Sequence, residues 1–282
     1  MNVRTIAVLG AGTMGHGVAH AAAAAGFATR LYDVSEAQLV KARSAVDGIL
    51  RKAVELGKLT AADADAALAR LVTTPDVSQA LADVDLVIET APERIEIKVQ
   101  LFAAIEAHAP ARAIVASNTS ALSITEMAGT LTDPTRVAGM HFFNPVHKMK
   151  LIEIVRALES SERALETIEA VSRQMGKETV LVREAPGFIT TRVNASIGNE
   201  AFYMLMEGVA SARDIDKALK LGLNHPMGPF ELVDLVGLDT RLSILEYLHR
   251  SMGEKYRPCP LLAQYVKAGR LGKKVGKGVY EY

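Results

Sequence analysis

Gly10-Ala11-Gly12-Thr13-Met14-Gly15 is the stretch that decides the fold of this chain, because it places a GxGxxG pattern between an apolar run and an alanine-rich run. The apolar run, residues 5–9, is typical of a short buried strand, and the alanine-rich run has strong helix propensity up to Gly26. The first glycine allows a tight turn, the second lets the backbone approach a pyrophosphate, and the third lets helix and sheet pack closely. Because the free N–H groups at a helix N-terminus attract anions, we expect this stretch to bind a dinucleotide.

Asp33 follows a second predicted strand, residues 28–32, and lies eighteen residues beyond Gly15. A carboxylate at this place can accept hydrogen bonds from the adenine ribose hydroxyls and repels a 2′-phosphate, so the sequence favours NAD over NADP. Arg30 lies too early on the strand to reverse that preference. The alternative is that Asp33 only caps the helix that begins near Ser35.

The chain beyond Asp33 alternates between helical and strand patterns. A long helix is expected over residues 36–56, and a second begins at Thr60, its expected N-cap, and runs to about residue 70. Strands are then expected at 86–89, 114–116, 137–140 and 151–155, with helices at 94–107 and 124–128. This order predicts an α/β fold, a Rossmann-type doubly wound parallel sheet.

The pattern changes at Ala185-Pro186-Gly187, after one more helix and a short strand at 179–182. From there on, only helical patterns appear, interrupted by glycine and proline. We therefore predict two domains, an NAD-binding Rossmann domain over residues 1–185 and an all-helical C-terminal domain over residues 186–282.

Charge and cysteine content exclude several classes of protein. The 282 residues contain 32 Lys+Arg and 32 Asp+Glu, which leaves no electrostatic footprint for nucleic acid or an anionic membrane surface. No apolar run approaches the roughly 20 residues that span a bilayer, and the chain opens on a strand pattern in place of a leader peptide. The single cysteine, Cys259, fits a reducing compartment. We expect a cytoplasmic protein without a metal ion.

His141 stands out among the seven histidines, because it ends the strand predicted at 137–140. Ligands of open α/β sheets bind outside the carboxyl ends of the strands. His20, His108 and His249 lie in predicted helices and are expected to be ordinary packed or solvated side chains.

Five blocks of the sequence together resemble one enzyme family. They are SNTSALSI (117–124), HFFNPVHKMKLIEIV (141–155), APGFI (185–189), HPMGPFEL (225–232) and LGKKVGKGVYEY (271–282). In this order they resemble the L-3-hydroxyacyl-CoA dehydrogenase family, particularly bacterial 3-hydroxybutyryl-CoA dehydrogenases. The resemblance covers essentially the whole chain. It implies NAD-dependent oxidation of an L-3-hydroxyacyl-CoA, such as 3-hydroxybutyryl-CoA, to the 3-ketoacyl-CoA, and the reverse reduction of acetoacetyl-CoA.

The resemblance also implies the catalytic roles. His141 would be the general base and acid, Glu153 would orient it, and Ser120 would hydrogen-bond the reacting oxygen beside the nicotinamide. The chemistry agrees, because a neutral imidazole can take the hydroxyl proton near physiological pH, and a carboxylate stabilises the imidazolium that forms. The alternative for Glu153 is a strand carboxylate on a solvated face.

Further binding residues carry over from the family to matching positions. Cofactor contacts are implied at Glu93, Lys98, Asn144 and Lys274, in addition to Ser120, and contact with the CoA end of the substrate at Lys52. The chain departs from the family at Thr191, where the family usually has an asparagine that is expected to bond the reacting centre. A threonine hydroxyl lacks the amide's reach and its second donor, and Asn194, one helical turn on, is a possible substitute.

The resemblance implies a homodimer formed by the C-terminal domain. The apolar stretches FELVDLVGL and AFYML fit such an interface, and they fit an ordinary core equally well.

Two other functions stay open: a β-hydroxyacid dehydrogenase, which would use a catalytic lysine, and a non-catalytic, crystallin-like NAD-binding relative. The acyl chain length of the substrate, the physiological direction of the reaction and its pathway, whether fatty acid or butanoate metabolism, also stay open.

Overall fold

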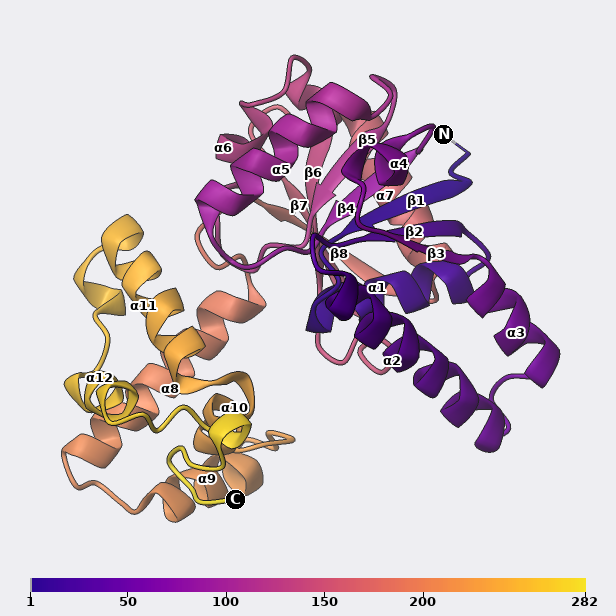
Figure 1. Cartoon of the computed structure of the whole chain (residues 1–282). Coiled ribbons are helices and arrows are strands. Elements are labelled where there is room, and N and C mark those ends of the chain that lie inside the picture. Colours follow the sequence, from indigo (N-terminus) through magenta and orange to yellow (C-terminus); the bar gives the residue numbers. More distant parts are fainter. Residues whose placement is uncertain (1) are drawn as a thin grey trace. The chain divides into compact units, whose positions relative to one another are not determined.

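The computed structural model describes residues 2–282 as two compact units, the first ending at Glu184 and the second running over Ala185–Tyr282 (Figure 1). The first unit is built on an eight-stranded sheet in the order β3-β2-β1-β4-β5-β6-β7-β8. Its strands are β1 (Thr5–Leu9), β2 (Ala28–Tyr32), β3 (Leu71–Thr74), β4 (Leu86–Glu89), β5 (Ile114–Ser117), β6 (Val137–Phe142), β7 (Leu151–Arg156) and β8 (Glu178–Arg183). The strand order turns back beside β1, which confirms the predicted doubly wound fold.

Helices connect these strands. They are α1 (Thr13–Ala24), α2 (Glu36–Glu55), α3 (Ala61–Ala69), α4 (Val77–Leu81), α5 (Ile95–His108), α6 (Ile124–Ala128) and α7 (Glu162–Gln174), with a short 3-10 turn, η1 (Pro134–Arg136). The predicted N-cap of α3 is confirmed, because the side chain of Thr60 accepts a hydrogen bond from the N–H of Asp63 at 3.1 Å. Ser35 caps α2 in the same way, with 3.3 Å to the N–H of Gln38.

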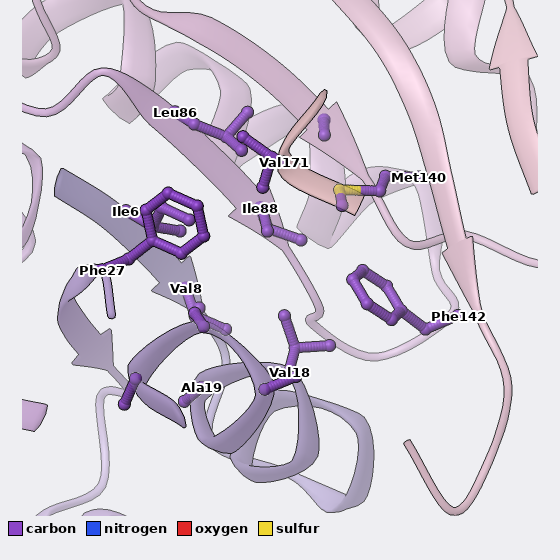
Figure 2. Packing of buried hydrophobic residues seen from close by; sticks show 14 of the residues in the cluster. Ile6, Val8, Val18, Ala19, Phe27, Leu86, Ile88, Met140, Phe142 and Val171 are labelled. Carbon is purple, nitrogen blue, oxygen red and sulfur yellow. The ribbon is translucent and has the colours of Figure 1, made fainter. Parts of the chain in front are cut away.

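The core of the first unit lies where α1 and α7 cover the sheet. Figure 2 shows Val18 and Ala19 of α1 beneath Val8 of β1 and Ile88 of β4, with Val171 of α7 nearby. Alternate residues of each strand face this layer, and all of these side chains are at most 3% exposed. The small residues of α1 therefore bring the helix close to β1, the strand that ends at the glycine turn.

Two features of the sheet differ from the prediction. β6 and β7 are antiparallel, because a short connection over residues 143–150 joins them and leaves no room for a crossover helix. β3, which extends the sheet beyond β2, and the short helix α4 that follows it were not indicated by the sequence. β3 has the sequence LVTT, and so short a strand has too few residues to show a period.

The second unit is helical, as predicted. It contains α8 (Thr190–Met206), α9 (Ala212–Gly222), α10 (Pro229–Val236), α11 (Leu238–Met252) and α12 (Pro260–Lys267), with short turns η2 (Glu254–Tyr256) and η3 (Lys273–Val275). Its C-terminal segment is held by Asp234, a buried carboxylate that accepts hydrogen bonds from the N–H groups of Val279 and Tyr280 at 2.8 and 2.9 Å. The only strand-like pairings within this described unit are isolated bridges at Lys277.

No helix among the described residues 2–282 is long and apolar enough to cross a membrane.

Candidate active site

The predicted site residues that follow strands of the first unit gather at one edge of the sheet. The glycine turn follows β1, Asp33 follows β2, and Ser120 lies three residues beyond the end of β5. These strands are parallel to one another and to β6, which carries His141 near its end. Because the carboxyl ends of parallel strands meet at the same edge, the sheet brings these residues together.

The glycine turn fits a bound pyrophosphate. A Cβ at Gly15 would lie 1.7 Å from the carbonyl oxygen of Gly10, so only glycine allows α1 to start this close to the strand. A Cβ at Gly12 would meet nothing within 4 Å among residues 2–282, which leaves open space over the turn. Gly12 also caps α1 without a side-chain hydrogen bond, so no side chain there satisfies the first N–H groups of this helix. Such a helix start is suited to the phosphates of NAD.

Asp33 connects the glycine turn to the start of α2. One carboxylate oxygen accepts a hydrogen bond from the N–H of Ala11 at 2.8 Å, and the other from the N–H of Ser35 at 3.0 Å. The helix cap itself is Ser35, so the alternative role of Asp33 as the α2 cap is taken by its neighbour. Arg30 is engaged elsewhere, since its guanidinium donates to the carbonyl groups of Gln79 and Ala82. The guanidinium of Arg30 is therefore held by backbone carbonyl groups.

His141 and Glu153 form a buried pair across β6 and β7. They are direct partners in the antiparallel register, and the distance from His141 Nδ1 to Glu153 Oε2 is 2.7 Å. Their side chains are 8% and 0% exposed. A carboxylate that accepts from Nδ1–H selects the tautomer whose basic nitrogen is Nε2. The alternative of a solvated strand carboxylate does not describe Glu153, because β7 is covered on both faces at this position.

The loop that carries Ser120 is fixed by Glu93. One oxygen of Glu93, Oε1, accepts hydrogen bonds from the N–H of Ser120 at 2.8 Å and from its hydroxyl at 3.1 Å. The same oxygen accepts from the hydroxyl of Thr119 at 2.7 Å and from the N–H of Ala121 at 3.2 Å. Glu93 thereby determines the position of the Ser120 hydroxyl.

Lys98 is buried, although the family resemblance implies that it contacts the cofactor. Its side chain is 1% exposed, and its ammonium lies 2.7 Å from Glu89 Oε1 and 3.5 Å from Glu93 Oε2. Lys98 therefore reaches the predicted site through Glu93. Sequence reasoning missed Glu89, although an acidic residue at the end of a buried strand, in the run Glu89-Thr90-Ala91-Pro92-Glu93, was a visible signal.

The remaining predicted residues lie at the surface or in the second unit. Asn144 is exposed and follows β6. Lys52 is exposed near the end of α2 and lies 2.8 Å from Glu55, which raises the pKa of Lys52. In the second unit, Thr191 occupies the first turn of α8, and Lys274 lies 2.6 Å from Asp239.

The chain is similar to known proteins over its whole length. The model of the 3-hydroxyacyl-CoA dehydrogenase NAD-binding domain matches residues 5–185, and that of the 3-hydroxyacyl-CoA dehydrogenase C-terminal domain matches residues 187–282. A probable 3-hydroxybutyryl-CoA dehydrogenase of Bacillus subtilis is 45% identical over 100% of this chain and 98% of its own length. A 3-hydroxybutyryl-CoA dehydrogenase of Bradyrhizobium diazoefficiens is 43% identical over 99% and 96%. The crystal structure of (S)-3-hydroxybutyryl-CoA dehydrogenase from Ralstonia eutropha superimposes with a TM-score of 0.95 at 42% identity, covering 100% of this chain and 99% of that one.

Proposed function

The chain belongs to the 3-hydroxyacyl-CoA dehydrogenase family, and on that premise we propose that it interconverts L-3-hydroxybutyryl-CoA and acetoacetyl-CoA with His141 as general base and acid. Family membership makes it an NAD-dependent oxidoreductase. The observation that supports the catalytic assignment is the buried pair of His141 and Glu153, with 2.7 Å between Nδ1 and Oε2 at the ligand-binding edge of the sheet.

In the oxidation, His141 accepts the proton of the 3-hydroxyl group at Nε2. Glu153 holds the ring in the required tautomer and stabilises the imidazolium, because its negative charge lies in a site that water does not reach. In the reduction, the protonated ring returns this proton to the ketone oxygen. Ser120 donates a hydrogen bond to the same oxygen from the loop that Glu93 fixes.

Bound NAD supplies the hydride acceptor for the oxidation, and NADH the hydride donor for the reduction. The residues that would hold it are the glycine turn, from Gly10 to Gly15, and Asp33 at the adenine ribose. Glu93, Lys98, Asn144 and Lys274 remain proposed cofactor positions, with Lys98 acting through Glu93. Lys52 is proposed to meet the CoA end of the substrate, and Thr191, with Asn194 one turn on, the reacting centre.

The test is turnover of acetoacetyl-CoA, followed as loss of NADH absorbance at 340 nm. We expect turnover with NADH and at least about 10-fold lower kcat/KM with NADPH, because Asp33 would repel the 2′-phosphate. Turnover of longer 3-ketoacyl-CoAs alone would contradict the short-chain substrate. No turnover with any of them would favour the non-catalytic alternative, while the family match and the His141–Glu153 pair speak against a lysine-dependent β-hydroxyacid dehydrogenase.

We also propose that the chain is a homodimer formed through the second unit. Large apolar side chains are exposed on or next to its helices, among them Leu221 of α9 at 77%, Leu223 just after α9 at 67% and Leu235 of α10 at 53%. Light scattering should give about twice the chain mass of 30.2 kDa. Leu221→Asp should shift the mass toward one chain, and a monomeric wild type would contradict the proposal.

A cytoplasmic location is part of the same proposal. Its support is Cys259, a buried free thiol, which suits a reducing compartment.

A further inference from the structure

Glu89 is a completely buried carboxylate that the proposed chemistry does not use. It ends β4, which is paired with β1 at the point where the strand order of the sheet turns back. Its side chain is 0% exposed, and both of its oxygens are engaged. A buried carboxylate is strongly unfavourable unless it is paired and hydrogen-bonded, so the position of Glu89 is determined by its partners.

The partners of Glu89 come from three segments that converge on the site. Oε1 accepts from the N–H of Ala91 at 2.6 Å and lies 2.7 Å from the ammonium of Lys98. Oε2 accepts from the hydroxyl of Ser117 at 2.6 Å and from Lys98 at 2.9 Å. Glu89 therefore fixes the start of the segment that leads to Glu93, the end of β5, and the buried lysine of α5.

Lys98 extends this arrangement to the Ser120 loop. Its ammonium lies between the two carboxylates, 2.7 Å from Glu89 and 3.5 Å from Glu93 Oε2. The second oxygen of Glu93, Oε1, accepts from Ser120 and its neighbours. One end of Glu93 is thus held by the buried ion pair, and the other end holds the serine.

We propose that Glu89 is a positioning residue of this enzyme and that it acts through Lys98 and Glu93 to fix the Ser120 hydroxyl. The inference rests on the proposed function only in that Ser120 bonds the reacting oxygen. Without the carboxylate of Glu89, the buried ammonium of Lys98 has the carbonyl oxygen of Ala91 at 3.3 Å and, as its one remaining carboxylate among the described residues, Glu93. Lys98 then draws Glu93 away from the loop, because Glu93 is the nearest remaining carboxylate and is itself 38% exposed and able to move.

Hydrogen exchange of the protein without cofactor tests this arrangement independently of activity. In Glu89→Gln, we expect the amides of Ser120 and Ala121 to exchange at least about 10-fold faster, because Glu93 is their hydrogen-bond acceptor. The matched control is Glu106→Gln, which removes another ion pair of the same unit, 2.6 Å from Arg136, at the opposite edge of the sheet. That control should leave these two amides unchanged. Equal exchange in E89Q and wild type would overturn the proposal.

Kinetics separate positioning from a general loss of stability. In E89Q, we expect kcat per folded molecule to fall about 10- to 100-fold, as for a misplaced catalytic group, and in E106Q to stay at the wild-type value. In a Ser120→Ala background, E89Q should change kcat by less than about 2-fold, because the group that Glu89 positions is already absent. Additive losses in the double variant would refute a role through Ser120.

A second variant covers the case in which E89Q does not fold. Glu89→Gln combined with Lys98→Met removes both buried charges and should fold, since an ion pair replaced as a whole leaves no unpaired charge. It should also show faster exchange at Ser120 and a lower kcat, because Glu93 loses the ammonium that holds its Oε2; wild-type values in both would refute the proposal. If wild type does not turn over acetoacetyl-CoA, the proposed function fails, and the exchange experiment still decides the role of Glu89.

Discussion

His141→Ala should lower kcat for acetoacetyl-CoA reduction about 1,000-fold, which is within the range for loss of a general acid–base group. Alanine offers no proton donor for the ketone oxygen and no acceptor for the hydroxyl proton. The KM for NADH should change little, because the residues proposed to hold the cofactor belong to other segments of the sheet edge. Steady-state kinetics at 340 nm, with NADH binding followed by fluorescence, measure both quantities.

The control for this result is His108→Ala, which removes a histidine from the last turn of α5 and should leave kcat unchanged. Glu153→Gln provides a second arm. The amide keeps the size of the side chain but loses the charge that stabilises the imidazolium and selects its tautomer, so kcat should fall about 100-fold. Retention of more than about a tenth of wild-type kcat by the His141 variant would contradict its role as the base.

Local patterns are sufficient to predict the βαβ unit that carries the proposed cofactor site. A GxGxxG pattern between strand and helix has one physical interpretation, and the turn lies where that interpretation places it, with Gly15 too close to Gly10 for any side chain. Asp33 was identified by its distance along the chain from the same turn. Both inferences need only one βαβ unit.

The His141–Glu153 pair could not be derived from local patterns. Its geometry depends on β6 and β7 being antiparallel, whereas the alternation of helices and strands indicates a parallel sheet. The two residues are twelve positions apart in the sequence, and this separation does not reveal their register. The family resemblance supplied the pairing, and the structure supplies the direct partnership across the strands.

Glu89 was missed in the sequence, and the burial of Lys98 was not predicted, because both features depend on the assembled fold. A strand carboxylate and a helical lysine are usually solvent-exposed, and burial of both is a property of the assembled sheet. Only the folded chain shows that the two charges neutralise each other beside Glu93. Arg241 is likewise buried in the folded chain, and no periodic pattern in the sequence indicates its burial.

Arg241→Met should stabilise the folded protein by about 1–3 kcal/mol, measured as the free energy of unfolding in urea near pH 7. Arg241 is 2% exposed in α11, and its Nε has no hydrogen-bond partner in the described chain. α8 passes directly beside it, since a Cβ at Gly198 would lie 3.8 Å from this Nε. Burial lowers the pKa of the guanidinium to about 10. Methionine fills similar space without a charge that must leave water.

The pH dependence has a definite sign. Because the pKa of Arg241 is lower in the folded than in the unfolded chain, folding disfavours the charged form, and this penalty is complete at pH values below about 10. As the pH rises above 10, the folded protein loses the proton first and the penalty shrinks. The stability advantage of R241M should therefore be largest near neutral pH and decrease above pH 10.

Arg250→Met is the matched control, because it replaces an exposed arginine of the same helix and should change the unfolding free energy by less than about 0.5 kcal/mol. If R241M instead lowers the stability, the guanidinium has an anionic partner in the folded enzyme, and its burial is compensated. A gain in stability shows that no anionic partner offsets the cost of burying this charge, and that Arg241 lowers the stability of the helical domain.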